Sequence, residues 1–196
     1  MEELDAVIEA WRTQDARFAT VRGYPWGEVV ADPRFPRLVV ANCAKVLARE
    51  PVDPAAVVAA TRTDLAHARR LAVVIHHPDD QPDLVVALST EGGDLFFDDV
   101  FVAGGTPATN TSRVAEVTDH DEAFWAAFRE TGALFGIVPD TLAELEVVER
   151  DVLLPAGKRW FVVRGEDGTI EAMAALLPGH AAEIDHVVTA PAARAS

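Results

Sequence analysis

The sequence of 196 residues lacks the features that define several classes of protein. It has one cysteine, Cys43, so no intrachain disulfide can form, and a free thiol of this kind suits the reducing cytoplasm. No apolar run approaches the ~20 residues that a membrane-spanning helix needs, and no basic segment leads into an apolar one at the N-terminus. Only 17 residues are basic against 32 acidic ones, and the resulting charge of -15 repels phosphate backbones and anionic lipids. We therefore expect a cytoplasmic protein that binds neither nucleic acid nor membranes.

The length and composition are those of a folded protein with one large domain or two small modules. Hydrophobic residues make up 49% of the chain and charged residues 25%, which are ordinary values for a globular core and surface. Residues 103–112 contain no bulky apolar side chain and are rich in turn formers, as linkers are. The sequence therefore predicts an N-terminal module over residues 1–105, a linker over residues 106–112 and a C-terminal module over residues 113–196.

The N-terminal module reads as a mixture of helices and strands. Leu4, Val7, Ile8 and Trp11 have the spacing of one helical face. Asp53 followed by Pro54 is typical of a helix start, and this helix is expected to run to about Arg70. A second helix is expected over residues 82–91, stopped by two glycines. The strands are expected at residues 18–22, 28–31, 38–41, 71–75 and 95–102.

The C-terminal module has a different order of elements. A strand at residues 113–117 precedes a helix that begins at Asp119 or Asp121 and carries three phenylalanines, Phe124, Phe128 and Phe135. A second helix opens near Asp140. Three strands then follow at residues 159–164, 169–177 and 181–189, separated by turn-forming residues that favour hairpins. The predicted order is strand, helix, helix and three strands, so the fold class is α/β, of the α+β kind with a mixed sheet.

This order of elements and the amino-acid sequences of two segments resemble the front half of the fold of the GNAT superfamily of N-acetyltransferases. Residues 160–172 (WFVVRGEDGTIEA) resemble the second and third strands of that family. Residues 182–194 (AEIDHVVTAPAAR) resemble the fourth strand and the approach to the acetyl-CoA loop. The order of elements after Leu38 is similar to the back half of the same fold. The resemblance implies a tandem protein with two partial acyl-CoA N-acyltransferase modules, the N-terminal one degenerate.

The resemblance also implies a cosubstrate and a site. In GNAT proteins the fourth strand ends in a splay that offers backbone groups to the pantetheine arm and the thioester of acetyl-CoA. Val187, Val188 and Thr189 take that place here, and Arg194 takes the first position of the R/Q-x-x-G-x-G/A loop that binds the pyrophosphate. The sequence reaches Ser196 before either glycine of that loop, so the C-terminal module is expected to be truncated there. We expect this chain alone to bind acetyl-CoA poorly and to have little or no acetyltransferase activity.

The residues themselves suggest which groups could handle protons. Glu183 and Asp185 near the end of the last strand could act as general bases toward an amine acceptor, a small molecule or a peptide. Regular alternation would put both on one face of the strand and His186 on the other. A solvated strand face also explains the two carboxylates.

Other chemically capable residues have structural explanations. His76-His77-Pro78-Asp79-Asp80 has metal-binding side chains, but neighbours on a strand point apart and no second cluster completes a shell, so we expect no metal. Cys43 is expected to be a buried thiol. The aromatic residues Tyr24, Trp26 and Phe35 are expected to anchor loops by packing, with the lining of a pocket as the alternative.

Several functions remain open at this stage. The first is acetyl transfer from acetyl-CoA to an amine. The second is a noncatalytic GNAT-like module that binds a small ligand or pairs with another subunit, and the third is an enzyme fragment without activity of its own. A sheet interrupted after its fourth strand would leave an open edge, so we expect the first module or a second copy, as in a homo-oligomer, to cover it.

Overall fold

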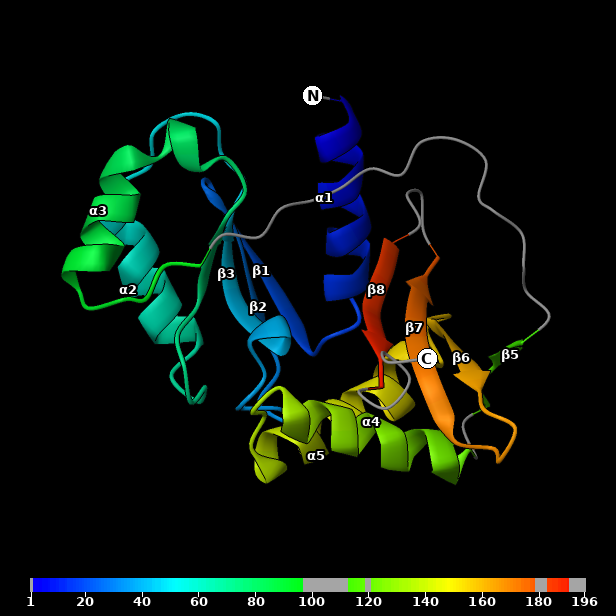
Figure 1. The fold of residues 1–196 in the computed structure, drawn as a ribbon. Coiled ribbons are helices and arrows are strands. Elements are labelled where there is room, and N and C mark those ends of the chain that lie inside the picture. Colours follow the sequence, from blue (N-terminus) through cyan, green and yellow to red (C-terminus); the bar gives the residue numbers. More distant parts are fainter. Residues whose placement is uncertain (1, 97–112, 119–120, 179–182, 191–196) are drawn as a thin grey trace. The chain divides into compact units, whose positions relative to one another are not determined.

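Residues 2–96, 113–118, 121–178 and 183–190 are described by a computed structural model of the chain (Figure 1). Among these residues the chain forms five α-helices and two four-stranded sheets, so the α+β class is confirmed. It divides into two compact units, one of residues 11–103 and the other of residues 1–10 with 104–196. We call them the N-terminal and C-terminal units and describe each by itself. The expected linker lies outside the described residues.

The sheet of the N-terminal unit combines antiparallel and parallel pairing. Helix α1 spans Glu2–Asp15, and strands β1 (Thr20–Tyr24), β2 (Gly27–Ala31) and β3 (Asn42–Val46) pair antiparallel in chain order. Helix α2 (Pro54–Asp64) then leads to β4 (Val73–Ile75), which pairs parallel with β3, and helix α3 (Pro82–Thr90) follows. A crossover helix between parallel neighbours is what parallel pairing requires. The predicted hairpin and the predicted helices are confirmed, although α2 ends six residues before Arg70.

The two faces of this sheet differ in polarity. Val29, Ala31, Ala44 and Val46 lie on the face that α2 and α3 cover, together with Val57, Leu65 and Leu84 of those helices (Figure 1). The opposite face carries Glu28 and Lys45, which are paired in the register of β2 and β3. Asp15, at the end of α1, contacts Lys45 there, its carboxylate oxygen lying 2.5 Å from Nζ. An apolar face and a partly charged face therefore share one short sheet.

Two strand predictions in this unit fail. The segment at residues 38–41 was expected to be a buried strand, but Val39–Ala41 form a 3-10 turn, and β3 begins only at Asn42. The amide of Asn42 donates hydrogen bonds to the carbonyl oxygens of Phe35 and Leu38, at 2.7 and 3.0 Å, which stabilises the turn. Leu95 and Phe96 do not form the start of the strand expected at 95–102, whose other residues lie outside the described part.

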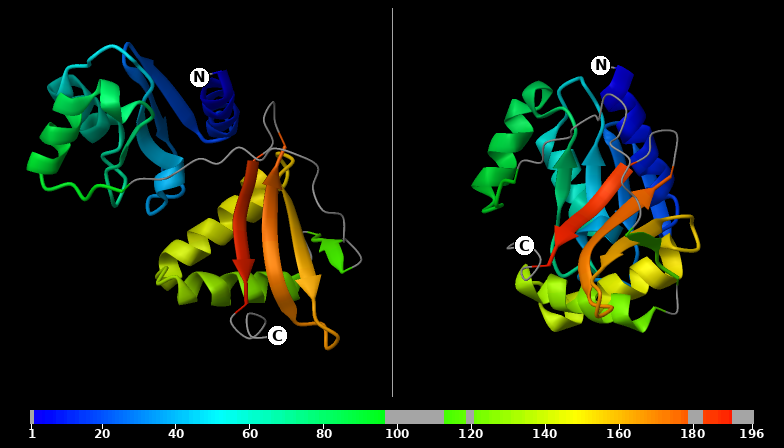
Figure 2. Two further views of the ribbon diagram at one scale, coloured as in Figure 1. Left: turned by 45° about the horizontal axis from the view of Figure 1, so that its top comes forward. Right: turned by 45° about the vertical axis from the view of Figure 1, so that its right-hand side comes forward.

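The C-terminal unit contains a meander covered by two helices on one face (Figure 2). Its sheet has the order β5 (Val114–Glu116), β6 (Arg159–Arg164), β7 (Ile170–Leu177) and β8 (Glu183–Thr189), and every pair is antiparallel. Helices α4 (Glu122–Leu134) and α5 (Pro139–Val148) lie between β5 and β6 in the chain. This is the predicted order of strand, helix, helix and three strands, with Asp121 rather than Asp119 as the N-cap of α4.

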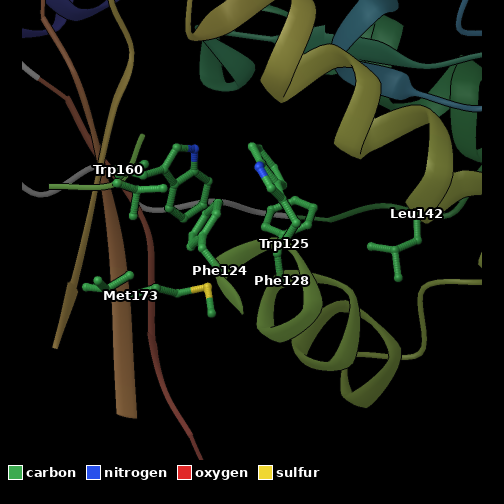
Figure 3. Packing of buried hydrophobic residues seen from close by; sticks show 9 residues of the cluster. Phe124, Trp125, Phe128, Leu142, Trp160 and Met173 are labelled. Carbon is green, nitrogen blue, oxygen red and sulfur yellow. The ribbon is translucent and has the colours of Figure 1, made fainter. Parts of the chain in front are cut away.

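The core of this unit is built from aromatic residues of α4 and β6. Phe124, Trp125 and Trp160 have no exposed surface, and Phe128 is almost fully buried. The rings of Phe128 and Trp160 meet edge to face, with centroids 5.7 Å apart (Figure 3). Phe135 was expected on the same helical face, but it lies just after the helix and is 67% exposed. None of the helices among the described residues combines the length and hydrophobicity that crossing a membrane requires.

Candidate functional site

A small apolar cavity lies between α4, α5 and the inner face of the C-terminal sheet. Its volume is about 60 Å³. The helices contribute Phe128, Gly132 and Leu142, and the strands contribute Trp160, Met173 and Val188. His186 also lines it, and it is the one group among the described lining side chains that can take up a proton. The cavity is therefore an apolar chamber with a single titratable ring, that of His186 on β8, in its wall.

Gly132 is the reason the two helices approach closely enough to enclose this chamber. It is buried inside α4, and a Cβ at this position would lie 2.5 Å from Cδ1 of Leu142. A glycine inside a helix costs about 1 kcal/mol of stability relative to alanine. Its presence here therefore indicates that the position has no room for a side chain. This glycine was the signal in the sequence that could have pointed to the cavity.

Strand β8 is irregular where it passes the cavity. Asp185 pairs with Ala175 and Val188 pairs with Met173, so His186 and Val187 together face the single residue Ala174. His186 has a φ of 52°, a left-handed conformation that non-glycine residues rarely adopt. A bulge of this kind re-aims side chains and interrupts the ladder of hydrogen bonds, and bulges are frequent beside active sites.

The bulge corrects the predicted alternation of the strand. In a regular strand His186 would lie on the face opposite the core, because its neighbour Asp185 pairs with the core residue Ala175. The extra residue of the bulge instead turns the imidazole toward Trp160, with ring centroids 5.3 Å apart. Register places Asp185 opposite Ala175 and Glu183 opposite Leu177. Sequence reasoning found the strand but could not place the bulge, because the bulge appears only when β8 is aligned with β7.

The other residues predicted for the site fall in different surroundings. Val188 lines the cavity, whereas Val187 is 72% exposed and Thr189 is exposed. Arg194, the expected first residue of the pyrophosphate loop, lies outside the described residues. The structure thus brings Val188 and His186 together at one cavity.

A buried ion pair holds one wall of the cavity in place. A π-helical turn at Glu149–Leu153 follows α5 and buries Glu149, and the Nζ of Lys158 lies 2.7 Å from its Oε1. The indole Nε1–H of Trp160 donates to Oε2 of the same carboxylate at 3.0 Å. Both oxygens are therefore used, and they fix the ring plane of Trp160 beside His186. Sequence analysis did not find this group of residues, and π turns of this sort are often found at functional sites.

The N-terminal unit has a loop where a GNAT-like module would bind a pyrophosphate, between β3 and α2. Here the buried side chain of Gln81 bonds to the backbone of this loop. Its Nε2 donates to the carbonyls of Ala48 and Glu50, at 2.9 and 2.8 Å. Its Oε1 accepts from the amide of Val52 at 3.0 Å. Gln81 thus bonds two carbonyl groups and one amide of the loop, and Pro51 and Pro54 have no N–H to offer. The described loop is a structural one.

The remaining candidates of the N-terminal unit have structural roles. Burial raises the pKa of the Cys43 thiol to about 11, which keeps it protonated and unreactive. The ring of Tyr24 stacks on Trp26 at 4.9 Å, as expected for packing. Among the residues that the structure describes, no group of three or more His, Cys, Asp or Glu side chains is arranged to hold a metal ion.

Comparisons of the chain with models of protein families, with curated proteins and with solved structures give no match. Neither unit is therefore assigned to a family by similarity. The chemistry of the site has to be inferred from the cavity, the bulge and the residues around them.

Proposed function

We propose that the C-terminal unit is a GNAT-type N-acyltransferase unit, which transfers an acyl group from acetyl-CoA to an amine beside the bulge of β8. The observation that carries the proposal is the bulge itself, at His186 and Val187, next to an apolar cavity. In that family the fourth strand opens to receive the thioester, and the bulge would serve this purpose here. The order of β5, α4, α5, β6, β7 and β8 is also that of the family's front half.

The described residues fit one end of acetyl-CoA and not the other. The regular hydrogen-bond ladder between β7 and β8 is interrupted at His186 and Val187, beside an apolar chamber. A chamber of this kind suits a short acyl group. A pyrophosphate needs a row of free amides, and in the described loop between β3 and α2 this row is broken, because Gln81 accepts from the amide of Val52 and Pro51 and Pro54 have no N–H. Acetyl-CoA would supply the acyl group in activated form when bound.

The chain's own residues would act on the acceptor. An amine that attacks an acyl group must lose a proton, and the imidazole of His186 is the described lining group that can hold it. Glu183 and Asp185 precede it on β8 and remain the candidate bases of the same strand. A cationic amine is the expected acceptor, because acidic residues exceed basic ones by 15 in this chain.

A noncatalytic binding function is the second candidate. The cavity walls are apolar apart from Thr131 and His186, which favours a small apolar ligand held without chemistry. Subunit pairing is a further form of this candidate, since β8 is one of the two edge strands of its sheet among the described residues and exposes Ile184 and Val187.

The test measures binding and thiol release separately on the full chain. Calorimetry with acetyl-CoA is expected to show binding in the millimolar range, and millimolar acetyl-CoA with a panel of amines is expected to release free thiol. Thr131→Leu fills the cavity and should reduce thiol release at least ~tenfold, whereas Thr63→Leu on the exposed side of α2 should not change it. Binding of acetyl-CoA without thiol release for any amine would favour the noncatalytic function. No binding and no release would refute the proposal.

A further inference from the structure

A second pocket, of about 200 Å³, lies entirely within the N-terminal unit, where α2 ends above β1 and β2. We call it the Arg22 pocket. Thr20 and Arg22 of β1 pair with Ala31 and Val29 of β2, so all four lie on the face of the sheet that α2 covers. The helix stops at Asp64, and the end of the sheet beyond it is left with a hollow. The proposed acyl-transfer site makes no use of this pocket.

Asp64 holds the guanidinium of Arg22 at the wall of the pocket. Its Oδ1 accepts from Nη1 of Arg22 at 2.6 Å, and its Oδ2 accepts from the hydroxyl of Tyr24 at 2.6 Å. The carboxylate side chain is only 9% exposed, and both of its oxygens have a donor. The Tyr24 hydroxyl also contacts this guanidinium, whose N–H donors outnumber these two contacts. The arginine therefore presents unused donors with its orientation already fixed.

The imidazole of His67 forms a second polar wall, and its tautomer can be assigned. Asn42 donates from Nδ2 to two carbonyl oxygens, so its Oδ1 is the acceptor end of the amide. This oxygen accepts from the amide of Asp32 and lies 2.7 Å from Nε2 of His67. Nε2 of His67 therefore carries a proton, and Nδ1 is the ring nitrogen left for a ligand. Only 1% of the surface of Asn42 is exposed, so this arrangement is rigid.

We propose that the Arg22 pocket binds a small monocarboxylate with a short branched apolar body. The carboxylate would accept from Arg22 and from the hydroxyl of Thr20, as charge-assisted bonds of this type are short and strong. The apolar body would lie on Val29 and Ala31, which are 1% and 8% exposed. The carboxylate group would lie on the side of Arg22 and Thr20, away from the Nδ1 lone pair of His67. An amine is disfavoured, because it would place a second cation beside Arg22 while the carboxylate of Asp64 is already satisfied by two donors.

The size of the pocket limits the ligand. A cavity of ~150 Å³ is known to hold one benzene molecule, so about 200 Å³ suits an organic acid of roughly four to six carbons. For a ligand of that size, affinities per atom suggest a Kd on the order of 1 mM. The probe for the experiment is 3-methylbutanoate, whose carboxylate carries a branched apolar body and which lies within that size range.

The experiment titrates the full chain, labelled with ¹⁵N, and follows amide shifts by NMR. Titration with 3-methylbutanoate is expected to shift resonances of β1, β2 and the end of α2, and 3-methylbutylamine at the same concentrations is expected to shift none of them. Arg22→Gln should weaken binding at least ~tenfold. The control is Arg62→Gln, since Arg62 is equally exposed, at 60% against 59%, and is ion-paired outside the pocket. That control should leave the Kd unchanged.

A second variant guards against loss of folding in the first. Ala31→Leu adds bulk to the floor of the pocket and leaves Arg22 and Asp64 in place, so it should abolish the shifts while the spectrum stays that of a folded protein. The proposal is overturned if the amine binds as well as the acid, if Ala31→Leu binds as tightly as the wild type, or if Arg62→Gln weakens binding as much as Arg22→Gln.

Discussion

The indole of Trp160 and the imidazole of His186 lie with their ring centroids 5.3 Å apart in the core of the C-terminal unit. Two irregular stretches of backbone meet at this one indole ring. The bulge of β8 brings His186 to it, and the π turn after α5 brings Glu149, which accepts a hydrogen bond from its Nε1–H. The position of the titratable ring thus depends on a buried ion pair, between Glu149 and Lys158, that comes well before it in the chain.

The left-handed backbone at His186 predicts a difference between two substitutions. Both His186→Asn and His186→Val remove the imidazole, but asparagine tolerates a positive φ and a β-branched valine does not. We expect the valine variant to be less stable than the asparagine variant by about 1–2 kcal/mol. Urea unfolding of both proteins, followed by tryptophan fluorescence, measures the difference. Equal midpoints and equal slopes would mean that the bulge is not held in this conformation.

The buried pair of Glu149 and Lys158 predicts a large effect of charge removal. Glu149→Gln leaves the ammonium of Lys158 buried without a counter-charge, so the free energy of unfolding should fall by about 3 kcal/mol. Glu116→Gln is the control, because Glu116 and Arg159 form an ion pair whose side chains are about half exposed. It should change the midpoint of denaturant unfolding little. Similar losses in the two variants would contradict the burial of the Glu149 pair.

Elements with local signals were predicted well from the sequence. Asp53 and Asp121 each accept a backbone hydrogen bond at a helix start, as N-caps do, and the three strands of the last meander follow their turns. The strand predicted at residues 38–41 failed because Asn42 stabilises a turn through contacts that no hydrophobic pattern encodes. Strand propensity counts apolar side chains, whereas this turn depends on hydrogen bonds from one polar side chain to two backbone carbonyls just before it.

The candidate sites were less accessible to sequence reasoning. The strand that carries His186 was located, but its bulge is a property of two strands in register. The closing of the loop between β3 and α2 depends on Gln81, which is about thirty residues away in the chain. The Arg22 pocket needs β1, β2 and the end of α2 together. Each of these features arises from contacts distant in sequence.

The charged face of the N-terminal sheet predicts that Lys45 is important for stability. Its ammonium lies 2.5 Å from Oδ2 of Asp15, and the two side chains are 12% and 3% exposed. Lys45→Met keeps the length of the side chain and leaves Asp15 without its partner, so we expect a loss of about 3 kcal/mol. Arg62→Met, which breaks an exposed pair with Glu91, is the matched control and should change stability little. A Lys45→Met protein as stable as the control would show that the Asp15 pair contributes nothing to folding.

The half-buried imidazole of His76 predicts how stability depends on pH. Burial is the main cause that lowers its pKa from 6.5 to about 4, with smaller contributions from the charges of Lys45 and His77. The folded protein therefore keeps His76 neutral at pH values where the unfolded chain binds a proton, so stability is lost as the pH falls from 6.5 toward 4. Partial exposure reduces the expected loss to about 2 kcal/mol over that window.

Replacing His76 by phenylalanine isolates this effect. His76→Phe keeps an aromatic ring near Trp11, whose ring centroid lies 5.5 Å from that of His76, and removes both the titration and a buried Nε2 that has no hydrogen-bond partner. Urea unfolding of the full chain at pH 7.0 and pH 4.5 should show a smaller difference for His76→Phe than for the wild type, by about 2 kcal/mol. His77→Asn, one residue further along, should retain most of the wild-type difference, because burial and not the charge of His77 is the main cause of the lowered pKa of His76. The explanation fails if the wild type and His76→Phe lose the same stability between the two pH values, because the acid sensitivity would then arise from other groups.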